Sequence, residues 1–184
     1  MKVLWVSNSP IGPLANILDK EYKGSSGGWI QSEYERINKD GLEFFFLYSV
    51  PEIRIGEVIK KKNEIGTLFC VTSPKLSYGV KPDKKLLNLI QNIINDIDPD
   101  VIHIWGTETW ISNAVALSET KAKKIVFIQG LIGVHQRYKG GYFCNNYINK
   151  HFANYISFIP NIFMFFRRHY FLKQVEIEKD TIKK

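Results

Sequence analysis

The sequence predicts an α/β protein with a doubly wound, mainly parallel Rossmann-like sheet and helices on both of its faces. Two stretches carry this prediction: 100–108 (DVIHIWGTE) and 125–131 (IVFIQGL). In each, a short apolar run stops abruptly at polar residues and glycine, which is typical of a buried parallel strand whose carboxyl end carries polar groups. Helical patterns alternate with such runs, and this order requires right-handed crossovers.

The amino-terminal half supplies three further apolar runs, which predict strands at 3–6, 44–48 and 67–71. Residues 7–28 are rich in Gly, Pro, Ser and Asn and are expected to form a loop. The charged stretch 52–65 fits either an edge strand or a loop, and both interpretations stay open.

Three helices are expected between these strands. The first spans about 29–38, with Ile30, Tyr34 and Ile37 on one face. The second has Pro82 in its first turn, and its apolar stripe consists of Leu86, Ile90, Ile93, Ile94 and Ile97. The third spans about 110–119, with Trp110, Ala114 and Leu117 on one side.

Composition narrows the range of functions. A chain of 184 residues can bury one real core, and its net charge of +7 favours anionic partners such as lipid headgroups or sugar nucleotides. The sequence has no zinc-ligand spacing and no RNA-binding signature, so we expect neither a metal nor nucleic acid. Cys70 and Cys144 fit no disulfide or metal spacing, which indicates a reducing compartment.

The chain is expected to divide into a Rossmann-like domain at 1–140 and an aromatic and basic helical extension at 141–184. The extension ends inside a charged helical pattern without a stop signal, so we expect a second domain beyond it. The first apolar run is too short for a signal peptide, and no run of eighteen apolar residues occurs. A cytoplasmic protein is therefore expected.

The polar residues that follow the strands predict a ligand site. The carboxyl ends of parallel strands share one edge of the sheet, where ligands bind in such folds. The expected cleft is lined by His103, Trp105, Thr107, Glu108 and Gln129.

A glycine-rich stretch, 24–29 (GSSGGW), leads directly into the first helix. It is either a phosphate-binding helix start or a flexible loop with a glycine cap, and both interpretations stay open. Gly-x-Gly-x-x-Gly does not follow the first strand, and neither a P-loop nor Gly-x-Ser-x-Gly occurs. Dinucleotide dehydrogenases, P-loop NTPases and α/β-hydrolases therefore lack support.

Taken together, these pieces resemble the N-terminal domain of a family 4, GT-B-fold glycosyltransferase. The matching stretches, in order along essentially the whole chain, are 2–6 (KVLWV), 27–29 (GGW), 100–108 and 129–133 (QGLIG). The resemblance implies a retaining enzyme with two Rossmann-like domains that moves a sugar from a nucleotide-sugar donor to a saccharide or lipid-linked acceptor. This half would bind the acceptor, and the absent half would bind the donor without a cofactor or metal.

The resemblance also suggests roles for single residues. The backbone of Gly27 and Gly28 would meet the donor diphosphate when the cleft closes. Gln129 stands where many members have His, and because an amide does not titrate, it would position substrate rather than transfer protons. The residues expected to bind acceptor are Trp29, His103, Trp105, Thr107, His135 and Arg137, the last two being placed to meet an anionic acceptor.

Several of these residues have a structural interpretation beside the functional one. Glu108 would hold an acceptor hydroxyl or would favour the dipole of the following helix as a first-turn acid. His103 lies inside a strand, where a satisfied buried histidine is the simpler interpretation. Trp105 and Trp110 would stack on a sugar or pack in the core.

The aromatic stretch 155–166, followed by Arg167 and Arg168, suits an anionic membrane surface at the inner face of the membrane, or packing on the sheet or on the absent domain. Two alternatives to the glycosyltransferase remain: a sugar-nucleotide 2-epimerase-like domain, and a non-catalytic carbohydrate- or membrane-surface binding module. Polysaccharide or cell-envelope assembly is the usual setting of the enzymes that the chain resembles.

Overall fold

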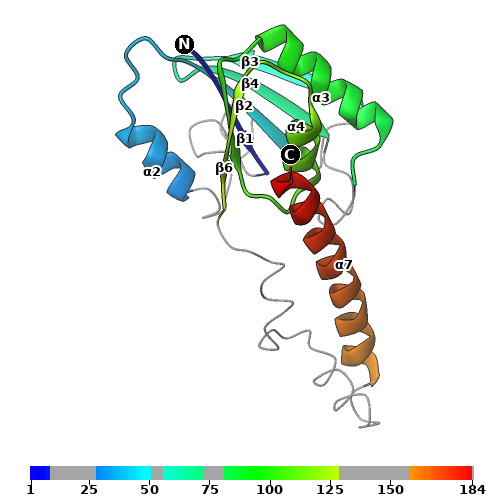
Figure 1. Cartoon of the computed structure of the whole chain (residues 1–184). Helices are drawn as coiled ribbons and strands as arrows, with labels where there is room; N and C mark the ends of the chain where they lie inside the picture. Colours follow the sequence, from blue (N-terminus) through cyan, green and yellow to red (C-terminus); the bar gives the residue numbers. More distant parts are fainter. Residues whose placement is uncertain (9–27, 51–55, 73–80, 129–157, 184) are drawn as a thin grey trace.

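The computed structural model describes residues 1–8, 28–50, 56–72, 81–128 and 158–183. These residues form one six-stranded sheet in the order β3-β4-β2-β1-β5-β6, with α3 and α4 on one face and α2 on the other (Figure 1). All neighbouring strands are parallel except β3 and β4. The predicted fold class is therefore confirmed.

The strands are β1 (Lys2–Ser7), β2 (Glu43–Val50), β3 (Val58–Lys62), β4 (Thr67–Thr72), β5 (Val101–Trp105) and β6 (Lys123–Phe127). The helices are α2 (Gly28–Arg36), α3 (Lys84–Ile97), α4 (Trp110–Leu117) and α7 (Phe158–Ile182). No helix in the described ranges is both long and apolar enough to cross a membrane.

The predicted apolar stripe of α3 is buried in a core that also contains residues of the sheet and of α4. The first helical residue of α3 is Lys84, two residues after Pro82, because the Asp83 carboxylate caps the helix by accepting the Leu86 N–H at 2.8 Å. Pro82 therefore precedes the cap and is not in the first turn. The helix stops at Asp98, which adopts a left-handed conformation with φ of 48° and whose N–H donates to the Ile94 carbonyl.

The opposite face of the sheet is an aromatic layer beneath α2. Trp5, Phe44 and Phe46 project from β1 and β2, and Ile30 of α2 is buried against this layer. Tyr34 meets the Trp5 ring edge-on at 6.0 Å between centroids. The predicted apolar face of the first helix is confirmed, and α2 is held over β1 and β2 by ring packing.

Of the two edge strands of the described sheet, β3 decides an open alternative and β6 corrects an expectation. The stretch 52–65, which the sequence left open, contains β3, an antiparallel edge strand. Lys60 of β3 pairs with Asp96 of α3 at 2.9 Å, and charge on an edge strand discourages pairing with other chains. The sequence predicts a buried strand at 125–128. The strand is present as β6, but its predicted burial is wrong: β6 has only β5 as a described neighbour, and Ile125 is 51% exposed.

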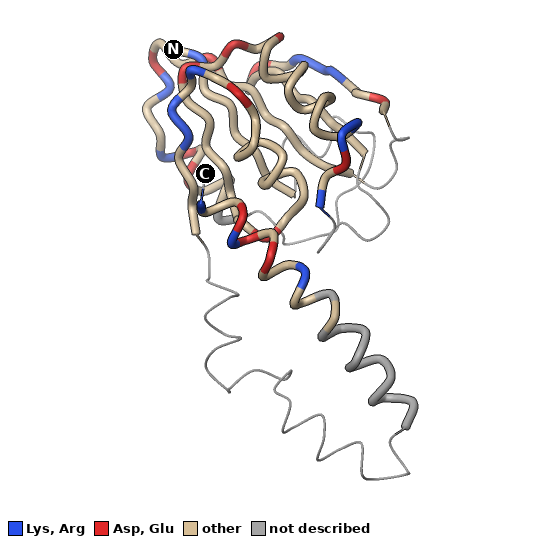
Figure 2. Tube along the Cα trace, turned by 45° about the vertical axis from the view of Figure 1, so that its right-hand side comes forward, with Lys and Arg blue, Asp and Glu red and all other residues tan. Residues whose placement is uncertain are grey.

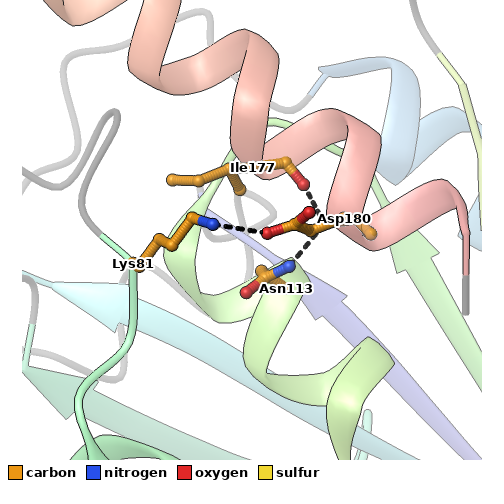
Figure 3. Close-up of polar contacts among 5 residues, drawn as sticks. Lys81, Asn113, Ile177 and Asp180 are labelled. Atoms are coloured by element: carbon orange, nitrogen blue, oxygen red, sulfur yellow. Dashed lines mark hydrogen bonds and ion pairs between the residues drawn. The ribbon is translucent and has the colours of Figure 1, made fainter.

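Helix α4 is buried almost all round because α7 covers the side that faces away from the sheet. The Asn113 amide donates to the Thr181 hydroxyl at 3.2 Å, and that hydroxyl donates to the Ile177 carbonyl at 2.8 Å (Figure 3). Beside them, Lys81 and Asp180 form an exposed ion pair at 2.7 Å. Leu117, predicted to lie on one side with Trp110 and Ala114, is 39% exposed at the end of the helix, whereas those two residues are buried.

Candidate functional site

The sheet reverses its winding between β1 and β5. Strand β1 continues through α2 to β2 on one side, whereas β5 on the other side is reached through α3 on the opposite face. The carboxyl ends of β1 and β5 therefore form the topological switch point, where open α/β sheets bind ligands. Ser7 and Asn8 end β1 there, and 106–108 follow β5 directly.

The turn after β5 depends on a glycine. Gly106 has a φ of 93°, which favours glycine, and its N–H donates to the Phe127 carbonyl of β6 at 3.1 Å. The Thr107 N–H donates to Oε2 of Glu108 at 2.9 Å. A Cβ built at position 106 would lie 3.3 Å from that same oxygen, so the Glu108 carboxylate folds closely over the turn.

The position of Glu108 tests the interpretation that it is an acid in the first turn of the following helix. Helix α4 begins at Trp110, and Thr109 is its N-cap, accepting the Ser112 N–H at 3.3 Å. Glu108 therefore precedes the cap, and the first-turn-acid interpretation is wrong. The half-buried carboxylate instead stabilises the turn at the switch point, and its role in holding an acceptor hydroxyl stays a prediction.

Two buried polar groups at this place lack partners among the described residues: Oγ1 of Thr107 and Nε1 of Trp110. Thr107 is only 1% exposed. Because more than nine in ten buried polar groups are hydrogen-bonded in folded proteins, such groups call for a partner beyond the described residues, which a water, a ligand or the protein itself can supply. Trp105 and Trp110 themselves are buried in the core.

His103 lies on the face of β5 that is turned toward α2, two residues before the end of the strand. Its ring stacks on Trp105 with 4.0 Å between centroids and meets Trp5 edge-on at 5.7 Å. Burial lowers the pKa of His103 below its usual 6.5, and Glu33 of α2 opposes this shift in part. The imidazole is therefore neutral near pH 7 and serves as part of the aromatic layer.

Phe127 is the aromatic ring that sequence reasoning missed at this edge. It is 44% exposed at the carboxyl end of β6, and it contacts the buried Trp105 ring at 4.9 Å between centroids. The alternation in β6 could have revealed it, since Lys123, Ile125 and Phe127 point to one face and lysine marks that face as solvated. Ser7, the last residue of β1, and Asn8, which follows it, were also missed, although they lie at the end of β1 as 106–108 lie at the end of β5.

Several predicted site residues lie outside the described residues, namely Gly27, Gln129, His135 and Arg137. The same holds for the aromatic stretch at 155–157 and for the side chains of Trp29 and 158–168. Gly28 is the first residue of α2. Within the described ranges, no group of three or more His, Cys, Asp or Glu residues is arranged to hold a metal ion.

The structure thus brings Thr107 and Glu108 together at the switch point. It places His103 and Trp105 on the adjoining sheet face, where Phe127 joins them. Cys70, the cysteine among the described residues, is buried in the aromatic layer, where burial raises the pKa of its thiol to about 11. Such a thiol is unreactive near neutral pH.

Comparison of the chain with protein-family models, curated proteins and solved structures found no match.

Proposed function

We propose that this chain is the acceptor-binding, N-terminal half of a retaining, family 4 GT-B-fold glycosyltransferase. The enzyme would move a sugar from a nucleotide-sugar to a saccharide or lipid-linked acceptor. The observation that supports this most directly is the polar turn 106–108 at the switch point between β1 and β5, with one half-buried carboxylate and one buried hydroxyl. The resemblance of the sequence motifs supplies the reaction.

The chemistry available at this turn suits acceptor positioning. The Glu108 carboxylate accepts hydrogen bonds, and a sugar hydroxyl donates them. Thr107 can donate or accept once a ligand reaches its buried hydroxyl. A retaining transfer proceeds through an oxocarbenium-like state. If the leaving diphosphate takes the acceptor proton, the protein needs to hold the hydroxyl rather than deprotonate it, and Glu108 would be a positioning group.

Binding and transfer assays test this proposal. Titration of the 184-residue chain with UDP-, GDP- and ADP-sugars should give little or no heat, because the donor site would lie in another half. The product of the full open reading frame should bind one of these donors and transfer its sugar. Tight binding of a nucleotide-sugar by the 184-residue chain, or the lack of any transfer by the full product, would contradict the proposal.

The membrane partner is tested separately with the full product. Co-sedimentation with vesicles of phosphatidylcholine and with vesicles containing phosphatidylglycerol should show binding to the anionic vesicles alone, since the chain carries a net charge of +7. If binding persists in 0.5 M salt, or is equally strong to both kinds of vesicle, the interaction with the membrane is not electrostatic and this part of the proposal is wrong.

A further inference from the structure

The exposed Phe127 is held in place by contacts between its ring and other aromatic rings. Its neighbour Trp105 lies at 4.9 Å, and Trp105 in turn meets Trp5 at 5.0 Å between centroids. His103 adds a further edge contact with Phe127 at 6.5 Å. Phe127 as a residue is 44% exposed, and the packed aromatic layer behind its ring fixes the apolar surface that it presents.

This ring belongs to the same edge of the sheet as the polar turn. The Phe127 carbonyl accepts the Gly106 N–H at 3.1 Å, which ties the end of β6 to the turn that carries Thr107 and Glu108. Strands β5 and β6 are parallel, with Trp105 paired to Phe127. One edge therefore offers an aromatic ring, a carboxylate and a buried hydroxyl within two adjacent strand ends.

These three groups match a hydroxylated ring better than other ligands. A pyranose has an apolar C–H face that packs on an aromatic ring and a rim of hydroxyls that donate to a carboxylate. Oε2 of Glu108 already accepts the Thr107 N–H, and the carboxylate has further lone pairs for ligand hydroxyls. A ligand site of mostly apolar surface with a few placed polar groups is the usual form for small molecules.

The charge of the described residues disfavours an anionic sugar at this place. Among the described residues that follow β1, β5 and β6, which are 8, 106–109 and 128, none is basic, and Glu108 carries a negative charge. The described lysines of these strands lie at the opposite ends, as Lys2, Lys123 and Lys124 do (Figure 2). A second carboxylate at the switch point would be repelled by Glu108.

We propose that Phe127 and Glu108 form a subsite for a neutral pyranose, with Phe127 packing on its C–H face and Glu108 accepting from its hydroxyls. This inference rests on the proposed function, and it assigns to the acceptor an uncharged sugar at this position. Phe127 is then a specificity-determining residue, and the exposed Ile125 on the same face lies outside the subsite, toward the other end of β6.

The experiment uses the 184-residue chain and saturation-transfer NMR with methyl glucoside, methyl galactoside, methyl mannoside and the methyl glucuronide. At least one neutral glycoside should bind, and the glucuronide should bind at least tenfold more weakly than the glucoside. Phe127→Leu keeps the apolar bulk but removes the ring, and should weaken neutral binding at least fivefold. Phe127→Tyr should restore it, and Ile125→Ala, the matched exposed control, should leave it unchanged.

Glu108→Gln tests the charge selection, because it should bring glucuronide and glucoside binding to within threefold of each other. Near-UV circular dichroism confirms that each variant keeps its aromatic packing. The subsite is refuted if no neutral glycoside binds, if Phe127→Leu binds like the original chain, or if the glucuronide binds best. Loss of binding in Ile125→Ala would indicate a broader apolar docking surface instead and would also overturn the subsite.

The outcome is separable from that of the proposed function. Glycoside binding that depends on Phe127, together with no sugar transfer by the full product, would establish the subsite and refute the enzyme. Sugar transfer by the full product, together with glycoside binding that is unchanged in Phe127→Leu, would establish the enzyme and refute the subsite.

Discussion

The two ends of the parallel strands are built in different ways. At the amino ends, the backbone and side-chain groups are paired with one another: the Lys2 N–H donates to the Asp100 carboxylate at 2.7 Å, and the Asp100 N–H donates to the Lys2 carbonyl at 2.9 Å. The Lys123 N–H donates to the Asp100 carbonyl at 3.0 Å. Asp100 thus ties β1, β5 and β6 together at this edge.

At the carboxyl ends, polar groups are left over. Oγ1 of Thr107 and Nε1 of Trp110 are buried without partners among the described residues, and Phe127 exposes its ring. Folded proteins break their own packing rules mainly at functional sites. The contrast indicates that the amino edge stabilises the sheet, whereas the carboxyl edge carries the groups on which the proposed ligand site depends.

The largest expected effect is at the amino end of β4. A Cβ at Gly66 would collide with the Phe44 carbonyl oxygen, so Gly66→Ala should lower the free energy of unfolding by about 3 kcal/mol. Urea denaturation measures it. Gly41→Ala is the matched control. Gly41 has a φ of 71°, but a Cβ added there would meet nothing within 4 Å, so the free energy of unfolding should fall by only about 1 kcal/mol, from the left-handed backbone conformation. Equal losses would mean that close approach of β4 and β2 does not matter.

The next effect is expected at the amino end of β6. The Lys124 ammonium donates to the carbonyls of Ala116 and Ser118 at 2.8 and 2.6 Å, at the carboxyl end of α4, where a cation also favours the helix dipole. Lys124→Met should therefore cost about 1.5 kcal/mol in thermal unfolding. Lys123→Met, at the exposed neighbouring position, should stay within about 0.5 kcal/mol. The contrast between the edges weakens if the two variants unfold alike.

Two threonines at the carboxyl edge allow a structural role to be distinguished from a role in the proposed site. Thr109→Val removes the N-cap of α4 and should cost about 1 kcal/mol. Thr107→Val replaces a buried hydroxyl that has no described partner by a group of the same shape, so stability should stay constant or rise by up to about 1 kcal/mol. Chemical denaturation of both variants checks this. A clear loss in Thr107→Val would show that its hydroxyl is bonded within the protein.

The smallest effect concerns His103, which lies between the two edges. Burial lowers its folded pKa below 6.5, so the unfolded chain binds the proton more readily. This contribution to stability is complete above about pH 6.5 and declines as the pH falls below that value. Urea midpoints at pH 7.5 and pH 5 should differ less in His103→Phe, which keeps the ring stack, than in the original chain. An identical pH dependence in both would exclude His103 as its source.

Local patterns in the sequence were sufficient for most elements. The stripe of α3 and the apolar face of α2 follow from helical periodicity, and β1, β2, β4 and β5 follow from apolar runs. Helix starts depend on single hydrogen bonds, which is why Pro82 and Glu108 were predicted to lie in the first turn although each precedes the N-cap of its helix.

Burial was harder to predict, because it depends on neighbours that are distant in the sequence. The run at 125–128 is as apolar as a central strand, yet β6 has β5 as its only described partner and leaves Phe127 exposed. Leu117 belongs to a helix that is otherwise almost wholly buried, but it is the last residue of that helix and is 39% exposed. Neither fact can be read from local composition.

By itself, the sequence determined the strands other than β3, the helices and the parallel winding, because backbone periodicity and apolar runs act over a few residues. The tertiary structure alone decided the strand order that creates the switch point beside β1, the exposure of Phe127, and the enclosure of Thr107 without a described partner. These features arise where segments far apart in the chain meet, and the free energy of such contacts depends on which surfaces remain uncovered.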